Sequence, residues 1–161
     1  MKDPDRRLSE LEALYRERFP YFIQVACAVV GDRDRAMEVV QEAFVGTIRS
    51  RDRFRGEGPL EAWVWRAVVN AARDAVRRPL VEAGSEPNDA YQAPEPVRRL
   101  APLIAALPER QRLAVFLRYY ADLDYRTIAD ALEIEVGTVS ATLATAHATL
   151  RKKLRKVEAD A

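Results

Sequence analysis

A row of nucleic-acid-binding side chains lies in the middle of the chain. Arg66, Asn70, Arg73, Arg77 and Arg78 are separated by four, three, four and one residues, so a helix would carry most of them along one side. An asparagine amide can form two hydrogen bonds with a base edge, and arginines bind phosphates or an unpaired base. The pattern predicts a surface that contacts nucleic acid.

Two neighbouring stretches carry related chemistry. Glu38, Gln41 and Glu42 lie at positions i, i+3 and i+4 of an otherwise apolar segment, where they form either a stripe that pairs with arginines on a partner helix or a solvated face. The loop Arg53–Leu60, RFRGEGPL, combines an aromatic ring, cations and turn-forming residues, which suits an unstacked base. Phe54 fits the wall of such a pocket and the hydrophobic core equally well.

Composition excludes several classes of protein. The formal net charge of +1 over 161 residues means that any nucleic-acid binding must be local. The chain has no phosphate-binding loop, no metal-spaced His/Cys cluster and no nucleophile–base pair, so we expect no enzyme and no metal or cofactor site. The single cysteine fits a reducing cytoplasm, and no apolar run is long enough for membrane insertion. We expect a cytoplasmic protein.

Helical periodicity dominates the chain and predicts an all-α fold. Apolar residues recur at helical spacing over three N-terminal segments, 8–30, 31–50 and 61–78, and over four more segments after residue 97. Residues 81–97 are instead rich in proline and acid, which favours an extended, flexible linker. The expected architecture is two small helical domains, residues 8–80 and 98–156, joined by this acidic linker.

The second domain has the spacing of a helix-turn-helix. Ala129 is the small residue at which two helices cross. The inward face of the second helix is expected to hold Val139, Leu143, Ala146, Leu150 and Leu154. The turn position that is commonly glycine is Glu133 here, and four helices with a short turn also fit a plain helical bundle.

Two long stretches together resemble one protein family. They are Leu14–Arg78, LYRERF…DAVRR, and Leu100–Val139, LAPLIAALPERQ…EIEVGTV. They resemble the two domains of bacterial σ70-type sigma factors of the compact extracytoplasmic-function group, in the same order and with the expected linker. The resemblance implies a protein that binds core RNA polymerase, through the β′ clamp helices and the β flap, and that selects and opens promoter DNA. It also implies an anti-sigma factor or another regulatory partner.

The resemblance implies three groups of site residues. Polymerase docking falls on Glu38, Gln41 and Glu42. The negative charge of this docking stripe is expected to be lower than usual, because Met37 and Arg35 stand where the family often has acids. Recognition and melting of the −10 element fall on Arg53, Phe54, Arg55, Arg66, Asn70, Arg73, Arg77 and Arg78. Contact with the −35 region falls on Arg126, Thr138, Ser140, Ala141, Thr142, Thr145, Arg151 and Lys152.

The helix expected to enter the −35 groove carries hydroxyl groups where the family commonly has Lys or Arg. Ser140, Thr142 and Thr145 hold these places. Hydroxyls bond to phosphates or to several base edges, but they cannot supply the bidentate arginine–guanine contact, which is worth about 1–3 kcal/mol of discrimination. We predict weak or relaxed −35 readout, with the domain positioned by phosphates, by the polymerase flap or by a recruiting protein.

Two other functions fit parts of the sequence. A helix-turn-helix regulator that acts without polymerase would need a basic recognition helix, which this chain lacks. An interaction protein that titrates polymerase or an anti-sigma partner would bind without opening promoters. The complete Arg/Asn row on the first domain argues against this second alternative.

Overall fold

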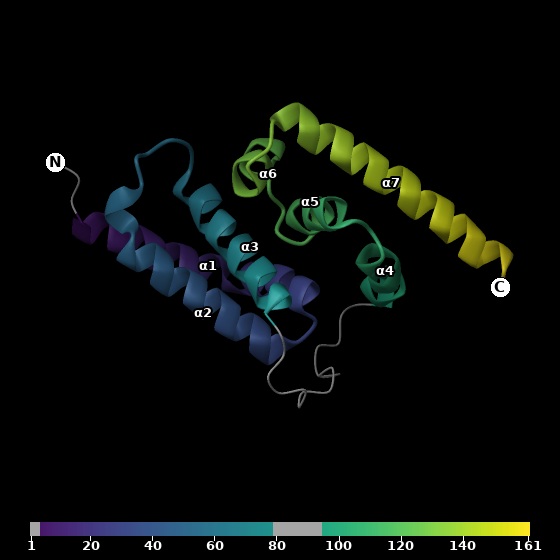
Figure 1. The fold of residues 1–161 in the computed structure, drawn as a ribbon, viewed down its shortest axis with the longest axis horizontal. Helices are drawn as coiled ribbons and strands as arrows, with labels where there is room; N and C mark the ends of the chain where they lie inside the picture. Colours follow the sequence, from purple (N-terminus) through teal and green to yellow (C-terminus); the bar gives the residue numbers. More distant parts are fainter. Residues whose placement is uncertain (1–3, 79–94) are drawn as a thin grey trace.

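The computed structural model describes residues 4–78 and 95–161, which are folded into helices without a β-strand in those ranges. The N-terminal half contains α1 (Pro4–Val30), α2 (Arg33–Arg49), the short 3₁₀ helix η1 (Arg51–Arg53) and α3 (Leu60–Arg77). The C-terminal half contains α4 (Glu95–Ala105), α5 (Glu109–Tyr119), α6 (Tyr125–Leu132) and α7 (Val136–Ala159). Figure 1 shows the two groups of helices side by side. The all-α prediction is confirmed, and none of the described helices is long and apolar enough to cross a membrane.

Local signals set the boundary between α1 and α2. Gly31 has a φ of 83°, a left-handed conformation that ends α1 and that side chains with a Cβ rarely adopt. Asp32 follows, and its carboxylate accepts a hydrogen bond of 3.2 Å from the amide of Arg35. This bond satisfies one of the free N–H groups at the start of α2. The chain therefore reverses within two residues, and α2 packs back along α1.

Aromatic side chains hold the three long helices of the first domain together. The ring of Phe22 on α1 lies 5.2 Å from that of Phe44 on α2 and 4.4 Å from that of Trp65 on α3, measured between centroids. Trp65 and Phe22 are fully buried. Because one side of α3 is anchored in this cluster, the polar row lies outside the core, and Arg66 and Asn70 line a groove together with residues of α2.

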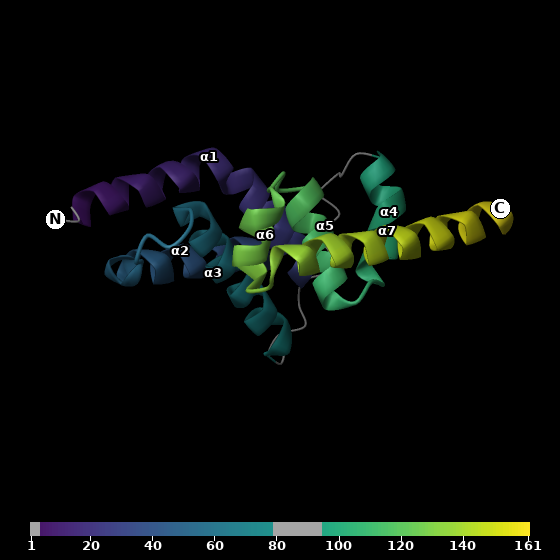
Figure 2. The same ribbon diagram turned by 90° about the horizontal axis from the view of Figure 1, so that it is seen from above.

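The helix-turn-helix prediction is confirmed in α6 and α7. Ala129 is 3% exposed where the two helices approach, and Val139, Leu143 and Ala146 of α7 are buried. Leu150 and Leu154 were expected to be inward as well, but they are only half-buried. The reason is that α7 continues past the other helices, as Figure 2 shows, so its last turns have less protein to pack against.

The turn between α6 and α7 places Glu133 in a strained conformation. Its φ of 57° and ψ of 45° are left-handed, and its amide donates to the carbonyl groups that end α6. A left-handed residue with a Cβ costs roughly 1–2 kcal/mol, which glycine avoids. The helix-turn-helix is thus built with a non-glycine residue at the position where the backbone favours glycine.

Replacing Glu133 with glycine is expected to raise the free energy of unfolding by about 0.5–1 kcal/mol, because it removes the left-handed strain. Urea denaturation followed by circular dichroism measures the change. Glu133→Ala is the matched control, since alanine keeps the same strain and should give no gain. A glycine variant no more stable than the alanine variant would show that the turn is not strained.

The start of the second domain differs from the expected boundary. Helix α4 begins at Glu95, so residues 95–97, which were expected to belong to the linker, are helical. Pro96 is compatible with this start because the first turn of a helix leaves its N–H groups unbonded. Residues 79–94, the rest of the predicted linker, lie outside the described residues.

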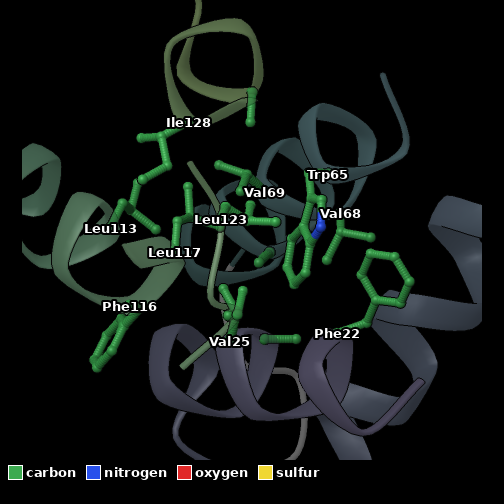
Figure 3. Packing of buried hydrophobic residues seen from close by; sticks show 14 of the residues in the cluster. Phe22, Val25, Trp65, Val68, Val69, Leu113, Phe116, Leu117, Leu123 and Ile128 are labelled. Atoms are coloured by element: carbon green, nitrogen blue, oxygen red, sulfur yellow. The ribbon is translucent and has the colours of Figure 1, made fainter. Parts of the chain in front are cut away.

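The two domains share one hydrophobic core. Buried residues of α1 and α3 form a single cluster with those of α5 and α6. Figure 3 shows Val69 of α3 close to Leu117 of α5 and Ile128 of α6, and these three side chains are at most 1% exposed. The domains are therefore packed against each other, an arrangement that the linker composition did not predict.

Candidate nucleic-acid interface

The predicted polar row lies on α3 and its C-terminal cap. Asn70, Arg77 and Arg78 are exposed, whereas Arg66 and Arg73 are partly covered. The spacing therefore correctly identifies residues that avoid the core of the first domain. It does not identify which members of the row face solvent and which face the second domain.

A basic pocket lies between the loop that follows η1 and the second domain. Its volume is about 450 Å³, and its lining residues include Arg53, Arg55, Arg66 and Arg126. Two acidic residues, Glu57 and Asp130, also line it. Four cations against two anions favour a negatively charged ligand. The pocket thus groups Arg126, which was predicted to contact the −35 region, with residues predicted to contact the −10 element.

Phe54 forms part of the lining of this pocket. Its side chain is only 9% exposed, and its ring centroid lies 5.4 Å from that of Trp63. The guanidinium carbon of Arg7, on α1, lies 4.5 Å from the centroid of the Phe54 ring, which is the distance of a cation–π contact. Of the two alternatives for Phe54, the structure favours a core residue that also forms part of the pocket lining.

Three arginines of the first domain reach across to the second. Arg66 donates from Nε and Nη2 to the carbonyl oxygen of Asp130, at 3.1 and 2.8 Å. Arg73 forms an ion pair with Glu109 at the start of α5. Arg18 of α1 donates from Nη2 to the carbonyl of Ala121 at 2.6 Å. Two of the predicted −10 residues are therefore engaged by protein groups.

The loop between η1 and α3 approaches α6 closely. Gly58 has a φ of 82°, and a Cβ placed on it would lie 3.1 Å from Oδ2 of Asp130. Glycine suits both the left-handed backbone conformation and this close approach. Gly58 thus allows the basic pocket to be closed on its second-domain side.

The predicted docking stripe is exposed along α2. Glu38, Gln41 and Glu42 all face solvent. The guanidinium group of Arg35 instead donates a hydrogen bond to the carbonyl of Ala75, at the end of α3. The guanidinium group of Arg35 is therefore directed at the end of α3.

An apolar groove adjoins this stripe. It has a volume of about 510 Å³ between α1 and α2, and Leu8, Tyr15, Phe44 and Val45 contribute to its lining together with Gln41. Leu8 and Val45 are 39% and 46% exposed, so apolar surface at the groove is open to solvent. The acidic stripe and the groove form one continuous surface.

The exposed face of α7 carries small side chains, several of them with hydroxyl groups, as the sequence predicts. Ser140, Ala141 and Thr145 are exposed, and Thr138 and Thr142 are half-buried. The hydroxyl of Thr145 donates to the carbonyl of Ala141 at 3.0 Å. One of the few polar hydrogens on this face is thus already used within the helix.

Other polar and charged side chains of the second domain lie outside this hydroxyl-rich face. Arg151 and Lys152 are exposed further along α7. His147 is hydrogen-bonded through Nε2 to the hydroxyl of Tyr119, at 2.7 Å. Asp124 caps α6, and hydrogen bonds from the hydroxyl and the amide of Thr127 hold the pKa of its carboxyl below its usual value. These contacts stabilise the helices that carry the exposed face.

Sequence reasoning did not identify four side chains that complete the interface. Arg7 contacts Phe54, Glu109 pairs with Arg73, Asp130 approaches Gly58, and Arg18 binds both Glu61 and the second domain. Each pair joins segments that are far apart in the chain, with 103 residues between Arg18 and Ala121. Helical periodicity carries no signal for contacts at such separations.

Comparison with known proteins assigns both halves of the chain to described domains. Residues 14–79 match the family model Sigma-70 region 2, and residues 98–156 match Sigma-70, region 4. The ECF RNA polymerase sigma-E factor of Escherichia coli K12 is 30% identical over 139 residues, which cover 73% of each chain. The RNA polymerase sigma-H factor of Pseudomonas aeruginosa is 28% identical over 151 residues, which cover 78% of this chain and 76% of its own.

Two solved structures have the same fold. One is CnrH in complex with the cytosolic domain of CnrY, with a TM-score of 0.76 at 20% identity and 95% coverage of both chains. The other is the sigma factor RpoE of Bartonella quintana in complex with the anti-sigma factor NepR. Its TM-score is 0.71 at 17% identity, over 91% of this chain and 97% of that one.

Proposed function

This chain belongs to the extracytoplasmic-function (ECF) group of RNA polymerase sigma factors, and from that membership we propose how its residues divide the work of initiation. As a sigma factor it binds core RNA polymerase and directs transcription initiation at promoters. The bond-forming chemistry then belongs to the polymerase, and we propose that this chain has no catalytic activity of its own. Its site of action would be the cytoplasm, where the polymerase works.

The first domain is proposed to recognise and melt the −10 element. The observation that carries this proposal is the convergence of the α3 row with the basic pocket, because Arg66 belongs to both. Asn70 would read a base edge, while Arg53 and Arg55 would hold the backbone or the base of a nucleotide that leaves the duplex. Arg77 and Arg78, exposed at the end of α3, would contact phosphates.

Polymerase docking is proposed on the surface formed by α2 and the adjoining groove. Glu38, Gln41 and Glu42 supply acceptors for basic side chains of the β′ clamp helices, and the groove supplies apolar area. Charged groups beside an apolar patch are typical of protein interfaces, where the charges orient the partner and the patch contributes affinity. The β flap would contact the second domain.

The second domain is proposed to give weak or relaxed −35 readout. The α7 face lacks a side chain able to make two parallel hydrogen bonds to guanine, and the Thr145 hydroxyl is engaged by the Ala141 carbonyl. Arg151 and Lys152 would hold phosphates, which positions the domain without reading sequence. We further propose an anti-sigma partner, because the two structural relatives were solved in complexes, RpoE with an anti-sigma factor.

Mapping of transcript 5′ ends tests these proposals. Core polymerase reconstituted with this protein would transcribe fragmented genomic DNA, and the starts would be sequenced. We expect the mapped promoters to share a −10 sequence and to show little or no common −35 sequence. A strong −35 sequence would contradict the assignment of α7, and binding to core polymerase without specific starts would favour a titrating interaction protein.

A further inference from the structure

The loop that follows η1 places Phe54 between two exposed arginines. Arg53 and Arg55 line the basic pocket and face solvent, whereas Phe54 is only 9% exposed. Two glycines follow, Gly56 and Gly58, with φ values of 78° and 82°. Glycine leaves the backbone of a loop free to adopt many conformations. The directions of the two arginines therefore depend on how firmly the Phe54 ring is held.

The ring of Phe54 contacts two side chains from other segments. The ring of Trp63, on α3, lies 5.4 Å away between centroids, and the guanidinium carbon of Arg7 lies 4.5 Å from the Phe54 centroid. Arg7 belongs to the first turns of α1, which lie beside η1 (Figure 1). A cation within about 6 Å of an aromatic centroid is attracted by the face of the ring. Arg7 thus ties the loop to the start of α1.

The surroundings of Arg7 favour this ring contact over other roles. Its side chain is 17% exposed, and among the described residues its Nη1 is shielded from water and has no hydrogen-bond partner. The guanidinium group has lost hydration, which its attraction to the Phe54 ring and to the carboxylate of Glu10, 3.7 Å from Nε, offsets. The neighbouring Arg6 pairs with the same Glu10, but its side chain is 80% exposed. Adjacent arginines with one carboxylate in common therefore have very different surroundings.

We propose that Arg7 is a positioning residue for promoter melting. By holding the Phe54 ring, it orders the loop so that Arg53 and Arg55 face the nucleotide that leaves the duplex. The inference rests on the proposed −10 role of this loop, and it adds to that role a residue from the start of α1. Within the described part of the chain, Arg7 lines neither the basic pocket nor the apolar groove beside the docking stripe. Its loss should therefore impair melting and leave polymerase binding unchanged.

Replacing Arg7 with methionine tests the proposal in the reconstituted holoenzyme. Methionine keeps an unbranched side chain but has no charge to attract the ring. The matched control is Arg6→Met, which removes the same charge and an ion pair with the same glutamate at an exposed position. Run-off transcription is measured from a mapped promoter, once as an intact duplex and once with its −10 region premelted by mismatches.

On the duplex we expect Arg7→Met to initiate about three- to tenfold less than Arg6→Met, the factor expected for loss of a cation–π contact. The premelted template should restore most of the loss, because the loop no longer has to trap a base while the duplex opens. Arg7→Lys keeps a cation over the ring and should initiate close to wild type. Affinity for core polymerase should be the same for all three variants.

Two further measurements separate loop positioning from a direct contact with DNA. Hydrogen exchange of the free chain should show the amides of residues 54–58 exchanging about three- to tenfold faster in Arg7→Met than in Arg6→Met, with α2 and α3 equally protected in both. Phe54→Leu removes the ring but keeps an apolar side chain. In that background Arg7→Met should cause no further loss of initiation, because the two residues act through one contact.

Four results would overturn the proposal. Arg7→Met could initiate like Arg6→Met on the duplex, lose as much on the premelted template, lose as much in the Phe54→Leu background, or leave exchange of the loop unchanged. Arg55→Ala separates these results from a failure of the proposed function. If Arg55→Ala initiates normally from the duplex, the −10 role of the loop is wrong and this inference falls with it. If Arg55→Ala is impaired and Arg7→Met is not, only the role of Arg7 is wrong.

Discussion

Replacing Asn70 with alanine is expected to lower promoter-specific initiation about ten- to hundredfold and to leave polymerase binding unchanged. The amide of Asn70 is the one group in the α3 row that can both donate to and accept from a base edge, and loss of such a contact costs about 1–3 kcal/mol. Asn70 is exposed, and alanine favours a helix more than asparagine does. The variant should therefore fold normally. Run-off transcription from a mapped promoter measures the loss.

Two companion variants separate base reading from general damage. Asn70→Asp keeps the shape of the side chain but removes the amide donor and adds a negative charge, so it should initiate as poorly as the alanine variant. Glu17→Ala, at an exposed position of α1 outside the docking groove and without a proposed DNA role, should initiate like wild type. Unchanged initiation by Asn70→Ala would refute the role assigned to this residue.

Reversing the charge of Glu42 is expected to weaken binding to core polymerase at least about thirtyfold. Loss of a buried, hydrogen-bonded interfacial charge commonly costs about 2–5 kcal/mol, and the arginine would in addition repel basic side chains of the partner. Glu42 is exposed in the middle of α2, so the substitution should not disturb the core. Co-purification with core polymerase, followed by titration of a fluorescently labelled variant, measures the effect.

Glu17→Arg is the matched control for this substitution. Glu17 is also an exposed glutamate on a helix of the first domain, but it lies on α1, outside the proposed docking stripe. It should leave polymerase affinity nearly unchanged. Salt should weaken the wild-type complex more than the Glu42→Arg complex, because the acidic stripe acts through charge. Equal affinity of wild type and Glu42→Arg would exclude this part of α2 from the interface.

Local patterns in the sequence were enough to locate the helices and much of the site. Apolar residues at helical spacing place the three long helices of the first domain within a few residues of their observed bounds. The caps that Asp32 and Asp124 form in the structure also act within three residues. The same periodicity separates the polar row of α3 from Trp65 in the core. It also predicts that α7 carries an exposed face rich in hydroxyl groups. All these features depend on residues that are close together in the chain.

Contacts between distant segments were beyond such patterns. Periodicity shows that Arg66 and Arg73 share a helix face, but it does not show that Asp130 and Glu109 cover that face. The burial of Phe54 under Arg7, and the position of Arg126 in the basic pocket, likewise depend on how α1, α3 and α6 pack. Side-chain type and spacing define which surfaces a helix presents, whereas the partner of each surface depends on the packing of the whole chain. That packing places groups of the second domain against two arginines of the proposed DNA-binding row.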